Sequence, residues 1–321
     1  MIALYSRRRH QRGLTLIELM VAMAISMLIT LVAISGLLIS QRGFRTVDAA
    51  SQLRDNGRFA SDLIQRLGVQ TGFRDRVFAA TQRTGANTAA PNVFGFNNAL
   101  MDAAAPLGTP TARTVSEVGY GSDILILRYQ ASETFPGSGV SDGSMIDCAG
   151  NPATALAADR DDRMVSILHV AINQGEPTLM CTYSITGAAP FTTTPVVQGV
   201  ENFQVLYGVA STAAGTGDSP VSYMRSNQLA SNDDWRRVRS LRIGMVLRGP
   251  LNSAQEKAAQ TLYPFGLAKN SATGAAGSAF ATTGDPDPDP GTLFSISSSD
   301  ADGRLRQVVT FTVHLRNDQT I

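Results

Sequence analysis

The chain has 321 residues, of which 43% are hydrophobic, 17% charged and 7% aromatic. This composition excludes a chain that is disordered throughout and allows one globular unit with an appendage. The formal net charge is +1, but four arginines lie within residues 1–13. Residues 14–321 therefore carry about −3, and a strongly basic body that binds nucleic acid is not expected.

The first forty residues join a short basic segment to a long apolar one. From Leu19 to Gln41 there are 23 consecutive residues without a charge. As a helix they would span roughly 35 Å, enough for a bilayer core of about 30 Å. The arginines before this stretch predict that the N-terminus stays in the cytoplasm and that everything after Arg42 is exported. The stretch is too long for an ordinary secretory signal, and no clear A-x-A cleavage site follows it. A simple single-span anchor remains the plain alternative.

One carboxylate, Glu18, lies four residues past Leu14, inside the apolar segment that begins there. A charge at that depth costs about 2.5 kcal/mol or more without a partner, so it marks a functional site. The run Gly13-Leu14-Thr15-Leu16-Ile17-Glu18 resembles the type III signal of type IV prepilins. The resemblance implies that a prepilin peptidase cuts between Gly13 and Leu14 and methylates the new amine. It also implies that Glu18, the fifth mature residue, pairs with that amine on a neighbouring subunit, which would offset the desolvation cost of both groups.

No proline interrupts residues 14–67, which predicts one helix of about 80 Å. Its first half, residues 14–41, would cross the membrane, and its second half, residues 42–68, is amphipathic. The apolar stripe of the second half is expected to pack on the following sheet. Gly68, with Thr71-Gly72 after it, is predicted to end the helix.

Residues 69–321 read as a β-rich domain in which strands alternate with loops rich in small and turn-forming residues. Alternation of buried and exposed positions, as in Arg242–Arg248, predicts a half-covered antiparallel sheet and hence an α+β fold. Loops are expected at 81–118, 133–146, 210–222 and 268–300. Strands are predicted at Asp123–Gln130, Met164–Ile172, Thr178–Ile185, Val200–Val209, Arg237–Arg248 and Gln307–Arg316.

Four segments of this domain resemble the PilW-like minor pilins and, more distantly, the J-type pseudopilins of type II secretion. They are Gly121–Tyr129, Val200–Gly208, Trp235–Arg242 and the ending from Asp302 to Asn317. The resemblance implies a pilin-like fold and a minor pilin that primes type IV pilus assembly, supporting adhesion and twitching motility. The chain would lie in the inner membrane with a periplasmic domain, and then in the pilus at or near its tip.

The partners implied by the resemblance are other minor pilins, the major pilin, the prepilin peptidase, the inner-membrane assembly platform and membrane lipid. A J-like pseudopilin is the first alternative, and a membrane-tethered periplasmic binding protein that never polymerises is the second. Neighbouring secretion or pilus genes would separate the first two.

The two cysteines, Cys148 and Cys181, both lie outside the membrane in this orientation. An even number in an oxidising compartment predicts one disulfide, which would contribute roughly 3.5–4 kcal/mol in the chain-entropy model. Two free buried thiols are the alternative. The spacing fits neither a CxxC redox motif nor a zinc site.

Catalytic motifs are missing, so no enzyme activity, cofactor or catalytic residue is predicted. His10 would leave with the leader, and His169 and His314 fall in predicted strands as structural residues.

Two further features each have an ordinary structural interpretation and a functional one. The acidic Asp285–Pro290 run and Asp300-Ala-Asp302-Gly303 could suggest calcium, but the full EF-hand spacing is absent, so no metal site is predicted. The arginines from 236 to 248 could form a DNA-contacting strip, but a solvated or subunit-facing strand edge is the preferred interpretation.

Overall fold

The structure is a computed structural model that describes residues 15–75, 89–154, 156–212, 219–254, 256–266, 290–317 and 319. The chain divides into two units, Met1–Asp48 and Ala49–Ile321. The predicted cleavage residues Gly13 and Leu14 and the acidic run at 285–289 lie outside the described residues.

Helix α1, Leu16–Gln70, is 55 residues long and has no proline to break it. It is the one described helix that is long and apolar enough to cross a membrane, with a mean hydropathy of 2.4 over its most apolar window. Its end differs from the prediction, because Gly68 lies inside the helix and the chain leaves it at Thr71-Gly72, where Gly72 has a φ of +76°. A glycine in this left-handed conformation is a common way to end a helix.

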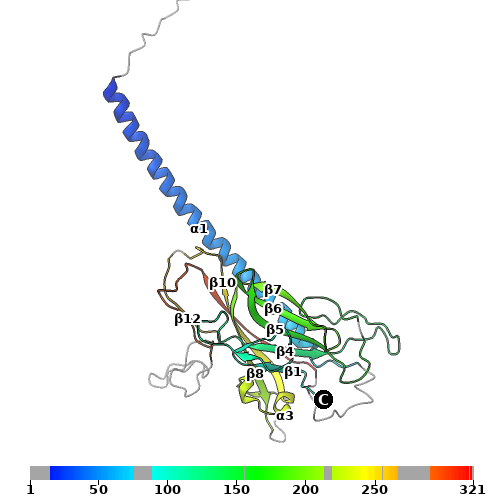
Figure 1. Ribbon diagram of the computed structural model, residues 1–321. Helices are drawn as coiled ribbons and strands as arrows, with labels where there is room; N and C mark the ends of the chain where they lie inside the picture. The colour runs from blue at the N-terminus through cyan, green and yellow to red at the C-terminus, as the bar shows by residue number, and fades with distance from the viewer. Residues whose placement is uncertain are drawn as a thin grey trace, which may run out of the picture. The chain divides into compact units, whose positions relative to one another are not determined.

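Two antiparallel sheets form the β-rich unit (Figure 1). The first has the strand order β1-β4-β5-β6-β7 and the second the order β13-β10-β8-β9. The strands of the first sheet are Val93–Phe96, Ile124–Tyr129, Met164–Asn173, Glu176–Ser184 and Thr192–Gln198, in that order. Those of the second are Arg306–His314, Val238–Arg248, Val200–Ala210 and Pro220–Met224.

Two small two-stranded sheets and short helical turns complete the described chain. They are β2 (Ala99–Leu100) with β3 (Thr111–Ala112), β11 (Gln260–Leu262) with β12 (Phe294–Ile296), the 3-10 turn η1 (Ser226–Gln228) and the short helix α3 (Asn232–Arg236).

The six predicted strands are confirmed to within a few residues, but three of the four predicted loops contain strands. The expected loop 81–118 contains β1, β2 and β3, while β9 begins inside the loop expected at 210–222 and β12 lies inside that expected at 268–300. Strand β7 was missed because Pro195 interrupts its sequence. Proline is tolerated here because β7 is an edge strand of its sheet.

One apolar core joins both sheets to the last turns of α1. Leu53, Ile64 and Leu67 are at most 2% exposed and pack in the same cluster as Phe203 of β8 and Ile243 of β10. Two helix glycines bring β13 close, because a Cβ on Gly57 would lie 2.8 Å from Val309 and one on Gly68 would lie 2.3 Å from Val313. The amphipathic half of the helix thus packs on the sheet, as its stripe predicts.

Candidate functional site: the helix start and its supporting domain

The carboxylate of Glu18 is hydrogen-bonded within its own chain at the start of α1. The Thr15 backbone N–H and hydroxyl donate to Glu18 Oε2 at 3.0 and 3.1 Å, and the Glu18 N–H donates to the Thr15 hydroxyl at 3.3 Å. This reciprocal arrangement is a capping box, which satisfies backbone donors that no helical carbonyl can reach. The signal was present in the sequence as Thr-x-x-Glu and was not used in the prediction.

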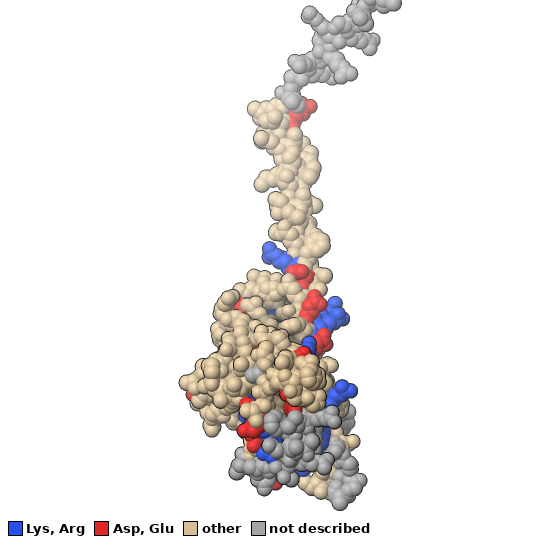
Figure 2. Space-filling view, turned by 90° about the vertical axis from the view of Figure 1, so that its right-hand side faces the viewer, with Lys and Arg blue, Asp and Glu red and all other residues tan. Residues whose placement is uncertain are grey.

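The helix surface beyond Glu18 is apolar and uncovered in the chain alone. Ile17, Met27 and Val32 are 70%, 76% and 69% exposed, and every residue of the most apolar window is outside the core. Figure 2 shows an uncharged surface along this part of the helix. The hydroxyls of Ser26 and Thr30 donate to the carbonyls of Ala22 and Ser26 at 2.7 and 3.0 Å, so these polar groups need no water. This half therefore requires lipid or other helices around it.

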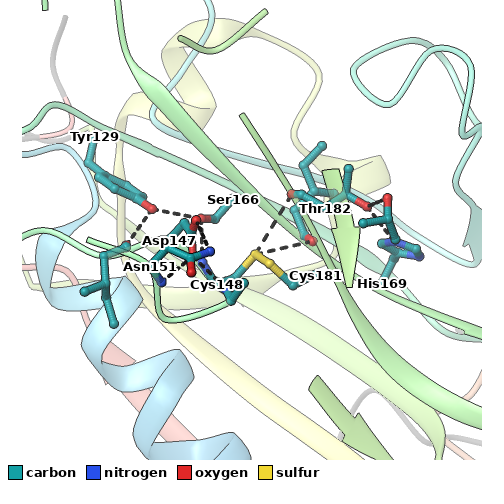
Figure 3. The surroundings of a disulfide bond; sticks show 12 residues. Tyr129, Asp147, Cys148, Asn151, Ser166, His169, Cys181 and Thr182 are labelled. Carbon is teal, nitrogen blue, oxygen red and sulfur yellow. Dashed lines mark hydrogen bonds between the residues drawn. A yellow bond between two sulfur atoms is a disulfide. The ribbon is translucent and has the colours of Figure 1, made fainter. Parts of the chain in front are cut away.

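Cys148 and Cys181 form a disulfide that joins the loop before β5 to β6 (Figure 3). Both residues are at most 1% exposed. Beside the bridge, the Tyr129 hydroxyl donates to the Ile146 carbonyl at 2.7 Å and lies 2.8 Å from Ser166 Oγ, which accepts from the Cys148 N–H at 3.1 Å. The loop is thus fixed covalently and by buried hydrogen bonds.

The buried Asp147 side chain closes the loop that contains Cys148. Its Oδ1 accepts from the N–H groups of Ala149 and Asn151 at 2.8 and 2.9 Å. Such side-chain turns hold a short loop in one conformation.

A network of six charges ties the two sheets together, and sequence reasoning missed it. Arg306, whose side chain is 2% exposed, donates to Glu201 at 2.6 Å and to Asp302 at 3.0 Å. Arg248 bridges Glu201 at 3.0 Å and Glu176 at 2.7 Å. The sixth member is Arg304, which bonds Glu176 at 2.9 Å and Asp302 at 3.2 Å. Three arginines and three carboxylates balance, so no charge is left unpaired in this half-buried position.

Burial alone would raise the pKa of Glu176, but hydrogen bonds from Arg248 and Arg304 outweigh it and hold that pKa below its ordinary value. The same balance, with Arg306 as donor, lowers the pKa of Asp302. The carboxylate of Asp302, the third residue of the calcium-like sequence, is therefore engaged by arginines. Among the described residues there is no group of three or more His, Cys, Asp or Glu side chains arranged to hold a metal ion.

The arginine run from 236 to 248 does not form the predicted strand edge. Strand β10 is central in its sheet, between β13 and β8. Arg236 and Arg237 pair with Asp233 and Asp234 at 3.1 and 2.5 Å, and Arg248 belongs to the charge network. The arginines thus serve separate local contacts.

Both predicted strand histidines lie in strands, with His169 in β5 and His314 in β13. His169 is 3% exposed and its Nε2 lies 3.0 Å from the Thr182 hydroxyl. Burial, aided by the charge of Arg113, lowers the pKa of His169 to about 4, so it is neutral at physiological pH.

Two families match the chain. The family described as Type IV Pilus-assembly protein W matches residues 168–317, and the prokaryotic N-terminal methylation motif matches residues 8–34. No curated protein matches at a significant level. Among solved structures, the type IV-like pilin TTHA1219 from Thermus thermophilus is similar, with 14% identity and a TM-score of 0.36, covering 82% of this chain and 94% of that chain.

The two family matches coincide with the features already described. The methylation motif covers the capping box and the start of the apolar helix, which fits membrane anchoring of a globular domain. The other match spans β5 to β13, the disulfide partner Cys181 and the whole charge network. Over residues 168–317 the chain is PilW-like, and over residues 8–34 it carries the N-terminal methylation motif, which together support a PilW-like type IV pilin.

Proposed function

We propose that the mature chain is a minor pilin that helps to prime type IV pilus assembly by helix packing and subunit contact, without turnover of a substrate. The observation that carries this proposal is a single carboxylate at the start of a helix whose next 23 residues are uncharged and exposed. A lone anchor has no need of a carboxylate at membrane depth, where it is costly.

In this mechanism the prepilin peptidase cuts between Gly13 and Leu14 and leaves a methylated amine on Leu14. Glu18 then exchanges its hydrogen bonds with Thr15 for the amine of a neighbouring subunit. The charge-assisted contact is stronger than the neutral bonds that it replaces, and it forms in a medium of low dielectric constant. Docking of a second chain is thereby favoured over a free subunit.

The exported domain supplies the other contacts, to further minor pilins and the major pilin, on a periplasmic side set by the arginines of the leader. Residence at or near the pilus tip, adhesion and twitching motility belong to this proposal through the filament. A J-like pseudopilin would use the same helix start, and its assembly would occur on a secretion platform.

The test is the N-terminus of the cellular protein, combined with variants of Glu18. Mass spectrometry should find a chain that begins at Leu14 with a methylated amine. Glu18→Ala should leave cleavage intact and reduce incorporation into sheared pili at least tenfold, whereas Asp55→Ala, which removes an exposed carboxylate later in the same helix, should leave incorporation unchanged.

A chain that still begins at Met1, or wild-type incorporation of Glu18→Ala, would contradict the proposal. Cross-linking from positions beside Glu18 separates it from a non-polymerising tether, because a tether gives no products with other pilins.

A further inference from the structure

A second polar site lies where β4 ends and β5 begins, among residues used by neither the disulfide nor the charge network. It is a pocket of about 310 Å³. Two arginines, Arg128 of β4 and Arg163 just before β5, contribute its charged wall. The other lining residues are Ala89, Ala90, Leu107, Asp161, Thr186 and Gly187.

Arg163 is buried and Arg128 is half-buried, and most of their guanidinium donors have no partner among the described residues. Arg163 is 6% exposed, and its Nη1 donates to Asn92 Oδ1 at 2.7 Å. Its buried Nε has no partner among the described residues. Arg128 donates from Nη1 to the Pro91 carbonyl at 2.7 Å. These two bonds hold the chain before β1 in place, but the buried Nε of Arg163 is left without an acceptor, which is costly and calls for a further one.

The carboxylate in the described pocket wall, Asp161, already accepts hydrogen bonds from an arginine outside the pocket lining. Asp161 accepts from Arg160 through both oxygens, at 3.0 and 2.8 Å from Nη2. The sequence of residues 76–88, which precedes the pocket wall, contains two arginines and no acidic residue. The pocket therefore has more positive than negative charge among its described side chains.

The lowered pKa values of the two arginines agree with this excess of positive charge. Burial, with the charge of Arg163 as the second cause, lowers the pKa of Arg128 to about 10. Burial likewise lowers the pKa of Arg163 to about 10, with Asp161 opposing the change and Arg74 and Arg160 adding to it. Both groups stay charged at neutral pH and repel each other, so an anion between them would stabilise both.

We propose that this pocket binds a phosphate group, held by the guanidinium forks of Arg128 and Arg163. Planar guanidinium groups match the oxygens of phosphate with paired hydrogen bonds. A phosphate near neutral pH carries up to two negative charges, which offsets both arginines, whereas a carboxylate offsets one. The phosphate could be free or part of a phospholipid headgroup, and the two sources are separated by experiment.

The test is titration calorimetry of the full-length chain in an uncharged detergent. One arm uses inorganic phosphate, a second uses a monomeric short-chain phosphatidic acid, and a third uses acetate. Binding of inorganic phosphate with one site per chain and a submillimolar dissociation constant supports a free ligand, and binding of the lipid alone supports a headgroup. Absence of binding in both phosphate arms, or acetate binding as tight as phosphate, overturns the proposal.

Variants locate the site. Arg128→Gln and Arg163→Gln should each weaken phosphate binding about tenfold or more, whereas Arg316→Gln, which removes an exposed arginine elsewhere, should leave it unchanged. Because loss of Arg163 also removes its bond to Asn92, Thr186→Glu provides a second route. Thr186 is exposed on the pocket wall, so a glutamate there should occupy the arginines and block phosphate, while Thr186→Gln should not. Equal affinity of Thr186→Glu and Thr186→Gln would overturn the assignment.

Discussion

The two parts of α1 differ in the exposure of their apolar side chains, although they form one helix. Before residue 49 its large apolar side chains are exposed, as at Ile29 with 63%. After residue 49 the apolar stripe is buried to 0% at Ile64 and Leu67 by strands of the same chain. The first part depends on a solvent or partner outside the subunit, and the second is stabilised from within. One continuous helix can therefore have one part suited to lipid or neighbouring helices and another part suited to a protein core.

The largest expected effect separates these two regions directly. Ile64→Ala should lower the free energy of unfolding of the β-rich unit by about 4 kcal/mol, because it leaves a cavity in the shared core. Ile29→Ala should change that free energy by less than about 0.5 kcal/mol, because its side chain is outside the core. Urea unfolding of the detergent-solubilised chain, followed by Trp235 fluorescence, measures both. Similar losses for the two variants would show that the comparison is wrong.

Removal of the disulfide tests how much the bridge stabilises the β-rich unit and whether the first part of the helix depends on that unit. Cys148→Ser combined with Cys181→Ser should cost about 3.5 kcal/mol of unfolding free energy by freeing the unfolded chain. The helical signal of residues 16–48 in detergent should persist after the β-rich unit has unfolded. As a control, alkylation of the unreduced, unfolded wild-type protein should label neither cysteine, and labelling of both would rule out the bridge.

Two glycines of the same helix compare its packed and uncovered parts directly. Gly68→Ala places a Cβ within 2.3 Å of Val313 and should cost about 2 kcal/mol by overpacking, more than the gain in helix propensity. Gly36 has no atom within 4 Å of a built Cβ, so Gly36→Ala should not destabilise the chain. Chemical denaturation of both variants decides the point, and a stabilised Gly68→Ala protein would contradict the close packing of β13.

The smallest effect is a dependence on pH that belongs to the second region alone. The pKa values of Glu176 and Asp302 are lowered in the folded chain, so their contribution is complete above the ordinary carboxyl range near pH 4 and is lost as the pH falls through the lowered values. We expect a loss of about 1 kcal/mol in acid, since both side chains keep some contact with water. Glu176→Gln should flatten this profile in unfolding curves from pH 6 to 2. If Glu176→Gln left the pH dependence of unfolding unchanged, the charge network would not contribute to stability.

Sequence reasoning succeeded where composition or periodicity decides the structure. The apolar run, the stripe ending at Leu67 and the alternating strands such as β13 carry their signals locally. It missed β1 and β7, because a glycine and a proline disguise short edge strands. It also missed the charge network, because Arg304 lies 128 residues from Glu176 and Arg306 lies 105 from Glu201. Pairings at that separation arise from the sheet register and leave no local pattern.

The cleavage and assembly residues are a different case. Gly13, Leu14 and Glu18 were predicted from a resemblance, and their roles remain predictions that a mass measurement can test. The Thr15–Glu18 capping box was available from spacing alone and adds a physical role for Glu18 before any partner arrives.

The contact of α1 with β13 has a consequence for how this protein reaches its folded state. In the export topology proposed above, Gly57 and Gly68 leave the membrane early, whereas Val309 and Val313 of the strand that covers them come much later in the sequence. In that topology the helix stripe stays uncovered until β13 has been translocated. Folding is therefore dominated by contacts between distant parts of the sequence, which makes it slow and exposes an adhesive helix face meanwhile. In the proposed topology, export should accordingly be sensitive to periplasmic holding chaperones and to deletion of β13.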